Sequence, residues 1–271
     1  MKTINKLKMT ILVVLSVMNL TWLQAQAPSQ SDAVMLQGFY WDSESETSWK
    51  KLDAMAGEIA TNFDMVWLPP SSLSDGGVGY HPRQWNNQSS NWGAAADLKT
   101  LIADLKAGGC RSIADIVVNH RGGKSTWNDF FEDDFGSYGK FQLTSAHICK
   151  DDECVGSGYA ATGANDTGYD VVCNARGGYC AARDLDHTNT TVQNSIKAYL
   201  KWLKGEFGYD GWRYDLTKGY NGGYTNLYNS AAGAYYSVGE YWDQSFDACL
   251  NWVKDANYNS TTFDFPMKYA A

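Results

Sequence analysis

Short apolar stretches with the pattern of β-strands alternate along this chain with stretches that have helical spacing. The strand-like stretches are residues 33–41, 64–68, 111–118, 211–219, 236–240 and 261–265, and the helical ones are residues 49–61, 94–107, 189–207, 224–234 and 244–254. Repeated strand–helix units joined by right-handed connections predict a parallel sheet with helices on its faces. Such a sheet is either open and doubly wound or closed as a barrel.

The position of the polar residues distinguishes these two architectures. Four predicted strands carry polar residues at or near their C-terminal ends: Asn119 and His120, Asp215, Glu240, and Asp264. A barrel brings these ends together around one mouth, whereas an open sheet spreads them along an edge. No Gly-x-Gly-x-x-Gly motif follows the first strand, which weakens the nucleotide-binding alternative. We therefore predict an α/β fold of the (β/α)8 TIM-barrel type, with about six βα units in this chain.

The regular pattern is lost between His120 and about Arg183, in a stretch rich in Gly, Asp and Tyr. Loops longer than about 15 residues usually carry function. We predict a loop-rich inserted domain at residues 120–183, after the third strand. The barrel would then consist of residues 28–119 and residues 184–271.

The first 27 residues differ in character from the rest. Three lysines precede an apolar run at residues 9–23, and Ala25-Gln26-Ala27 follows, which is the pattern of a signal peptide with its cleavage site. A transmembrane anchor is the alternative, but the run is shorter than the roughly 20 residues that a span needs. We predict that residues 1–27 are removed and that the protein is secreted, to the cell exterior or the periplasm.

Charge and composition restrict the partners. The leader contributes three lysines and no acidic residue, so removing it takes the formal net charge from -8 to about -11. An acidic exported protein is a poor candidate for binding nucleic acid or an anionic membrane, and we expect a monomer. The 11 Trp and 17 Tyr residues suggest carbohydrate, because sugar rings stack on aromatic faces, although many of these side chains will belong to the core.

Six cysteines suit an oxidising compartment. They are Cys110, Cys149, Cys154, Cys173, Cys180 and Cys249, and four of them lie within residues 149–180. Disulfides in this loop-rich stretch are favoured over zinc because the spacings are not those of paired Cys-x-x-Cys motifs. The connectivity stays open.

Arg213 and Asp215 lie two residues apart on a predicted strand, so both face the same side of the sheet. Burying them is costly unless they pair or serve chemistry, and a structural ion pair is the simple alternative. Glu240 ends the next strand beside two aromatic residues. We expect Arg213 to lower the pKa of Asp215 and burial to raise the pKa of Glu240. A glycosidase needs such a nucleophile and acid, and carboxyls about 5 Å apart would give retention of configuration.

Four ordered motifs resemble those of the α-amylase family of glycoside hydrolases: Asp115 to His120, Asp184 to His187, Gly211 to Lys218, and Val238 to Glu240. The resemblance covers residues 33–265. Its details, such as Gln37-Gly38-Phe39 and Gly79-Tyr80, are most similar to plant-type α-amylases.

The resemblance implies roles for several residues. Asp215 would be the nucleophile, Glu240 the general acid/base, and Arg213 the residue that orients the nucleophile. Sugar contacts would come from His120, Tyr80, Lys218 and Trp242. Taken alone, His120 would be a satisfied polar residue and Tyr80 a surface aromatic. Asp115 is interpreted as structural.

The family also implies a calcium ion between the inserted domain and the barrel. The ligands would be Asn119, Asp166, Asp184 and the carbonyl of Gly219, all hard oxygen donors that suit Ca²⁺. Asp170 could serve a second ion. Asp166 also fits a simple turn, and Asp184 and Asp186 could cap the helix that begins near Asn189.

The chain departs from the family pattern at its end. The family has a third catalytic carboxylate in an Asn-His-Asp motif after the seventh strand, whereas this sequence stops at Ala271, and Asp264 does not match that motif. Six strands cannot close an eight-stranded barrel. We expect a fragment that is inactive by itself, derived from a secreted endo-acting α-amylase that cleaves starch-like α-1,4-glucans. The alternatives are another specificity of the family and a non-catalytic glucan-binding protein.

Overall fold

A computed structural model describes residues 32–150, 161–164 and 182–271. Its main sheet contains six parallel strands in the spatial order β1-β2-β5-β10-β11-β12. These strands are β1 (Met35–Gln37), β2 (Met65–Leu68), β5 (Arg111–Ile116), β10 (Gly211–Tyr214), β11 (Ser237–Gly239) and β12 (Thr261–Thr262). The spatial order follows the chain order without a reversal, as in a barrel and unlike a doubly wound sheet. The prediction of an incomplete TIM-type barrel is therefore confirmed.

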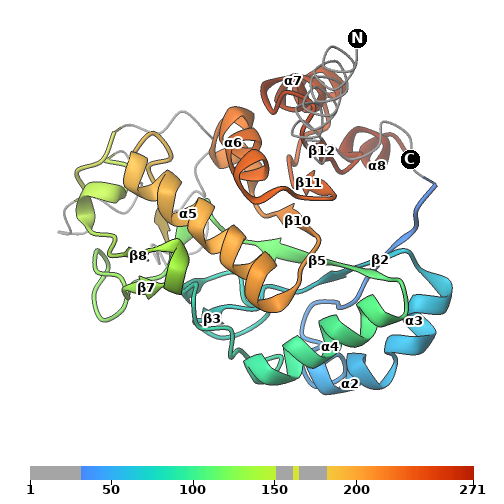
Figure 1. The fold of residues 1–271 in the computed structure, drawn as a ribbon. Helices are drawn as coiled ribbons and strands as arrows, with labels where there is room; N and C mark the ends of the chain where they lie inside the picture. Colours follow the sequence, from blue (N-terminus) through green and yellow to red (C-terminus); the bar gives the residue numbers. More distant parts are fainter. Residues whose placement is uncertain (1–31, 151–160, 165–181) are drawn as a thin grey trace, which may run out of the picture.

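The helices lie outside this sheet and follow it in chain order (Figure 1). They are α2 (Trp49–Ala54), α3 (Ala56–Asn62), α4 (Ala95–Ala107), α5 (Thr190–Trp202), α6 (Gly222–Ala232), α7 (Phe246–Asp255) and α8 (Phe265–Ala270). The helix predicted at 49–61 is divided at Met55, and the one at 189–207 ends in a π-helical turn, Leu203–Phe207. Asn189, rather than Asp184 or Asp186, caps α5 by accepting a 2.8 Å hydrogen bond from Thr191 N.

The chain after β12 differs from the prediction. The strand expected at 261–265 is only two residues long, and Asp264 is the N-cap of α8, accepting a 3.0 Å hydrogen bond from Met267 N. Pro266 lies at the start of this helix, where its missing N–H costs nothing. Asp264 is therefore a capping residue and does not join the polar groups at the strand ends.

The central strands have few polar positions because most of their residues are buried in the core. All four residues of β2 and all four of β10 are buried, as are the last five residues of β5. On β10 the side chains alternate: the Tyr214 hydroxyl donates to Asn229 of α6 at 2.9 Å, while Arg213 bonds to Asp115 of β5. Tyr214 and Arg213 therefore lie on opposite sides of this strand.

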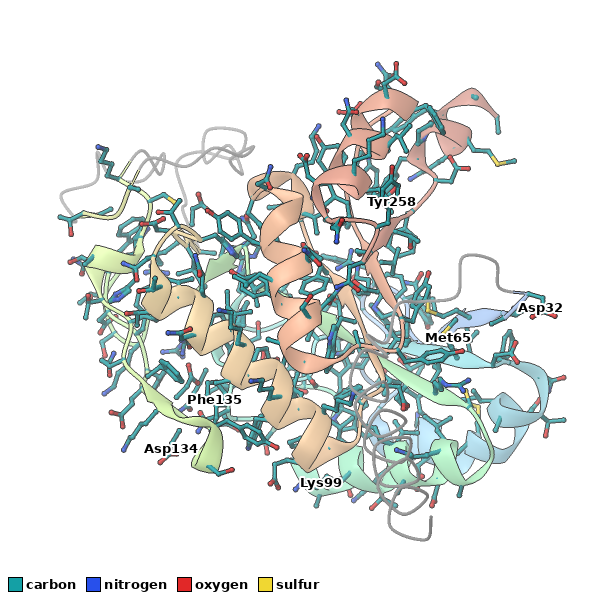
Figure 2. All side chains as sticks on the ribbon, turned by 45° about the horizontal axis from the view of Figure 1, so that its top comes forward. Asp32, Met65, Lys99, Asp134, Phe135 and Tyr258 are labelled. Atoms are coloured by element: carbon teal, nitrogen blue, oxygen red, sulfur yellow. The ribbon has the colours of Figure 1, made fainter. Side chains whose placement is uncertain are left out.

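The described part of the predicted insertion packs against α5. Its strands are β6 (His120–Arg121), which pairs with β9 (Arg183–Asp184), and β7 (Asp133–Asp134), which pairs with β8 (Lys140–Phe141). Phe135 lies beside α5, with its ring centroid 5.8 Å from that of Tyr199 (Figure 2). Arg121 and Asp133, both fully buried, form an ion pair of 2.7 Å that joins β6 to β7.

The described residues test two further sequence predictions only in part. No helix among them is long and apolar enough to cross a membrane, and residues 1–27 lie outside them. Cys110 and Cys249 carry free thiols rather than disulfides. Cys154, Cys173 and Cys180 lie outside the described residues.

Candidate active site

The ends of β10 and β11 bring the two predicted catalytic carboxyls together. The parallel register pairs Tyr214 with Gly239, so Asp215 and Glu240 follow as neighbours at the carboxyl ends of the strands. A 2.9 Å hydrogen bond from Glu240 N to the Tyr214 carbonyl continues the pairing. Local alternation and strand register therefore suffice to place both side chains at one mouth of the sheet.

Arg213 joins these carboxyls. Its Nη1 atom lies 2.8 Å from Asp215 Oδ1, and its Nη2 atom lies 2.9 Å from Glu240 Oε2. The Arg213 side chain is 3% exposed, so the charge-assisted hydrogen bond to Asp215 and the ion pair with Glu240 lie away from bulk water, where they are strong. A planar guanidinium holds both acids in a defined relative position, which a lysine could not do.

The electrostatics agree with one expectation and correct another. Burial raises the pKa of Glu240 to about 7, against the opposing effect of Arg213, as predicted for a general acid. The pKa of Asp215 was expected to be lowered by Arg213. Instead burial raises the pKa of Asp215, and the nearby charge of Asp115 adds to the rise, while Arg213 opposes it. The effect of desolvation on the pKa of Asp215 exceeds the opposing effect of its ion pair with Arg213, because the guanidinium is shared among several carboxyls.

Asp115, interpreted as structural, anchors the residues of this site. Its Oδ1 atom lies 2.9 Å from Arg213 Nη1, and its Oδ2 atom accepts hydrogen bonds from Tyr80 Oη (2.9 Å) and Trp67 Nε1 (3.0 Å). Burial raises the pKa of Asp115 to about 6. A signal existed in the sequence: an acidic residue within a buried strand needs partners, and Asp115 pairs in register with Arg213.

The Tyr80 ring forms one wall of the site. It lies 5.6 Å from the guanidinium carbon of Arg213, and its other neighbour is Trp41, whose ring is stacked at 6.0 Å and 9°. Trp41 is 68% exposed and was not singled out by the sequence analysis, although it ends the aromatic run that follows β1. Nε2 of the buried His120 lies 2.8 Å from the Tyr80 carbonyl, so His120 and Tyr80 are neighbours.

Lys218 and Trp242 come from the segments that follow β10 and β11, beyond the two carboxyls in the chain. Lys218 Nζ donates to Asp243 Oδ2 at 3.0 Å and to the Trp242 carbonyl at 3.3 Å. The Trp242 ring is 44% exposed and stacks on Phe265 at 4.6 Å, while its Nε1 atom donates to the Tyr269 hydroxyl. The ring contacts of Trp242 thus involve α8.

Three of the four expected calcium ligands lie close together. Pairing of β6 with β9 places Asp184 opposite His120, next to Asn119, and both Asp184 and Asn119 are buried. Asn119 Oδ1 is buried and has no hydrogen-bond partner among the described residues. A Cβ atom at Gly219 would lie 1.8 Å from it, so the backbone of Gly219 approaches this oxygen closely.

These residues fit a hard cation, because an amide oxygen, a carboxylate and nearby backbone are suitable donors. Asp166 and Asp170 lie outside the described residues. Within the residues that are described, no three His, Cys, Asp or Glu side chains gather as a metal site. The cation fit therefore rests on Asn119, Asp184 and Gly219.

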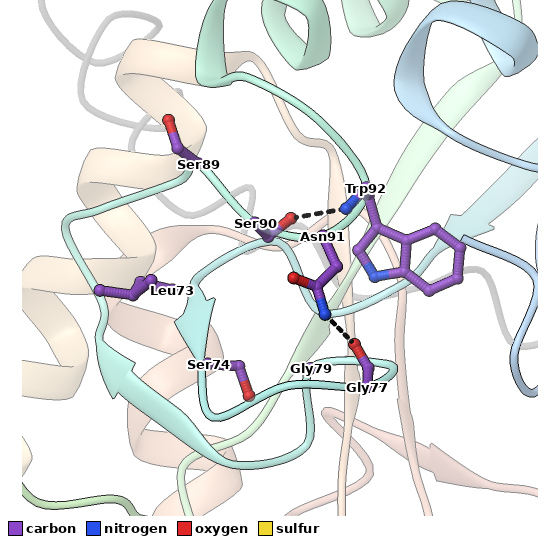
Figure 3. Close-up of a pocket in the computed structure, with 8 residues that line it drawn as sticks. All are labelled: Leu73, Ser74, Gly77, Gly79, Ser89, Ser90, Asn91 and Trp92. Atoms are coloured by element: carbon purple, nitrogen blue, oxygen red, sulfur yellow. Dashed lines mark hydrogen bonds between the residues drawn. The ribbon is translucent and has the colours of Figure 1, made fainter. Parts of the chain in front are cut away.

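A separate pocket of about 260 Å³ is formed by the chain segment that connects β2 to α4 (Figure 3). It is lined by Leu73, Ser74, Gly77, Gly79, Ser89, Ser90, Asn91 and Trp92. The Trp92 side chain is fully buried and donates from Nε1 to the Val78 carbonyl, so the ring offers no open face to a ligand. None of the candidate catalytic residues lines this pocket.

Comparison with known proteins gives a consistent result. Residues 58–271 match the family model of the alpha amylase catalytic domain. The chain is 31% identical over 226 residues to chloroplastic alpha-amylase 3 of Arabidopsis thaliana, which covers 78% of this chain and 22% of that protein. It is 29% identical over 250 residues to the probable alpha-amylase 2 of the same plant, covering 87% of this chain and 57% of the relative.

The fold is similar to that of solved amylases. The alpha-amylase of Geobacillus thermoleovorans, solved with acarbose, aligns with a TM-score of 0.60 at 17% identity, covering 91% of this chain and 53% of that one. The alpha-amylase of Malbranchea cinnamomea aligns with a TM-score of 0.59 at 20% identity, covering 91% and 51%. The chain thus spans about half the length of these structures.

Proposed function

Because this chain belongs to the α-amylase family of glycoside hydrolases, we propose that its site hydrolyses internal α-1,4-glucosidic bonds of starch-like glucans with retention of configuration. The observation that carries the proposal is the bridging of Asp215 and Glu240 by Arg213 at adjacent strand ends. This geometry supplies a nucleophile and an acid on one side of the sheet mouth.

In the proposed reaction, Asp215 attacks the anomeric carbon while Glu240 protonates the leaving glycosidic oxygen. Glu240 then removes a proton from the water that releases the sugar from Asp215. A pKa of about 7 allows Glu240 to serve in both steps near neutral pH. Arg213 holds Asp215 in position and favours its charged form against the effect of burial.

The remaining site residues would bind the glucan. Tyr80 offers a ring under the sugar at the cleavage point, and His120 lies beside it to bond the sugar hydroxyls. Lys218 and Trp242 would contact the leaving side. We propose starch-type glucans as the only partners, a monomeric state, and secretion directed by residues 1–27.

Calcium is proposed as the resident ion. Asn119, Asp184 and the Gly219 carbonyl would bind it together with Asp166. The ion would supply a charge-dense link between the barrel and the segment after β6, because its ligands come from both. The buried Asn119 Oδ1 atom supports this assignment, since the amide oxygen would otherwise lose its solvation without compensation.

We also propose that residues 28–271 alone have little activity, because β1 and β12 are both edge strands of the described sheet, which is therefore not closed as a barrel. The test compares starch hydrolysis by this segment with hydrolysis by a chimera that continues it with the C-terminal part of a related amylase. Activity is expected only in the chimera, and product analysis on amylose reports endo cleavage. Starch binding without hydrolysis by the folded chimera would instead favour a glucan-binding protein.

A mechanism-based fluorinated maltosyl fluoride provides a second test. Mass spectrometry of the labelled chimera should place the sugar on Asp215. A label on another residue would refute the assigned nucleophile.

A further inference from the structure

The residue after the proposed nucleophile has an unusual backbone. Leu216 adopts φ 42° and ψ 54°, in the left-handed region that disfavours residues with a Cβ atom. Among the described residues, only Asp42, Asn257 and Tyr258 share a positive φ without being glycine. Strain of this kind persists where the surrounding contacts require it, and it often occurs at functional sites.

The left-handed turn directs two consecutive amides toward one residue. Leu216 N donates to the carboxyl oxygen Oε2 of Glu240 at 3.1 Å, and Thr217 N donates to the Glu240 carbonyl at 3.2 Å. In an extended strand, successive N–H groups point to opposite sides and could not both reach the same neighbour. The turn at Leu216 therefore holds Glu240 by its backbone and by its side chain.

The same carboxyl oxygen also forms an ion pair with Arg213, whose Nη2 atom lies 2.9 Å from Oε2. Because Oε2 accepts from the Leu216 N–H and faces the positive charge of Arg213, a proton on this carboxyl resides on Oε1. A proton on Oε2 would lie against the N–H group and the guanidinium. The N–H group of Leu216 therefore helps to determine which carboxyl oxygen of Glu240 carries the proton.

We propose that Leu216 is a positioning residue for the general acid: its left-handed backbone directs its N–H to Glu240 Oε2 and, with Arg213, confines the transferable proton to Oε1. This inference rests on the proposed role of Glu240. The leucine side chain is not required for it. What is required is a residue that tolerates positive φ and has an N–H.

The charged groups that face Glu240 are Arg213 and Asp215 from β10 and its turn, and Asp115 from β5. Substitutions at Leu216 leave all three in place. A change in the titration of Glu240 in these variants therefore reports a change in the backbone conformation at residue 216.

The experiment compares Leu216→Ile with Leu216→Asn in the full chain. Isoleucine has the same composition as leucine but is β-branched and resists positive φ, whereas asparagine tolerates it. The Glu240 carboxyl is followed by ¹³C NMR of glutamate-labelled protein and assigned by its absence in Glu240→Gln. Because the amide hydrogen bond favours the charged form, its loss in Leu216→Ile should raise the titration midpoint by about 0.5 to 1 unit.

Leu216→Asn and Leu216→Gly should titrate like the unmodified chain, and thermal unfolding of each variant verifies that it is folded. Equal midpoints in Leu216→Ile and Leu216→Asn, or a rise in Leu216→Gly as large as that in Leu216→Ile, would overturn the proposal. The titration needs no substrate. Failure of the proposed hydrolysis is therefore distinguishable from failure of the positioning role.

Discussion

The hydroxyl of Tyr80 donates a 2.9 Å hydrogen bond to Oδ2 of the buried Asp115. This contact connects the ring proposed to lie under the sugar with a carboxyl that also binds Arg213 through its other oxygen. The proposed sugar platform and the arginine that orients the catalytic acids thus share one anchor, which lies on β5 rather than on the strands that carry the acids.

Asp115→Asn should destabilise the fold. All three partners of Asp115 are donors, so the amide NH₂ of asparagine must face at least one of them. We expect a loss of about 2–4 kcal/mol in the free energy of unfolding, measured by urea denaturation. Asp134→Asn is the control, because that side chain is 57% exposed and should change little. Equal stability of the two variants would contradict the proposed anchor.

The Arg121–Asp133 pair should be critical for the segment that packs on α5. Arg121 also donates to the Arg83 and Phe131 carbonyls at 2.9 and 3.1 Å. Arg121→Met leaves the Asp133 charge buried and should cost about 3–5 kcal/mol of folding free energy. The double variant Arg121→Met/Asp133→Leu should recover part of this loss in calorimetry. Lys140→Met, which breaks an exposed pair with Glu132, is the control and should have no measurable effect.

The rate of starch hydrolysis should fall as the pH rises through about 7 in a catalytically active form of the protein. Glu240 must be protonated to act as an acid, and burial places its pKa at about 7. A pH profile of kcat measures this decline, which forms the alkaline limb of the profile. Glu240→Gln should lower kcat by roughly 10²- to 10⁴-fold and remove the limb, and Asp215→Asn should abolish turnover. An alkaline limb that persists in Glu240→Gln would assign the acid elsewhere.

Stability should also depend on the protonation of Glu240. Its pKa is raised from an ordinary value of 4.5 to about 7 in the folded state, so the folded chain retains a proton that the unfolded chain has lost. The contribution of this proton to the free energy of unfolding is complete below pH 4.5 and disappears as the pH rises toward 7. Melting temperatures of the unmodified chain and of Glu240→Gln, measured between pH 4.5 and 7.5, should show a smaller decline in the variant. Parallel curves would contradict the raised pKa.

Calcium should stabilise the chain if the proposed ligands bind it. Saturation at 100 times the dissociation constant adds about 2.7 kcal/mol to the free energy of unfolding. Melting temperatures with Ca²⁺ and with EGTA measure this effect, and Mg²⁺ serves as the control ion. Asp184→Asn should reduce the shift produced by Ca²⁺. Gly219→Ala should reduce it too, because the new Cβ atom would collide with Asn119 Oδ1. An unchanged Ca²⁺ shift in both variants would place the ion elsewhere.

The sequence by itself determined the order of strands and helices and the meeting of Asp215 with Glu240. Both follow from local rules: side chains alternate on a strand, and parallel neighbours end at the same edge. Arg213 could be placed beside Asp215 for the same reason, and the pKa of Glu240 could be predicted to rise because its neighbours are aromatic.

Only the tertiary structure decided the features that depend on contacts distant in sequence. Asp115 meets Tyr80 and Trp67 across 35 and 48 residues, and Asp264 caps α8 because β12 ends early. The direction of the Asp215 pKa shift depends on the balance between desolvation and a guanidinium shared by three carboxyls. Such a balance is set by depth of burial and by which atoms approach within hydrogen-bonding distance, and neither is contained in the spacing of residues along a chain.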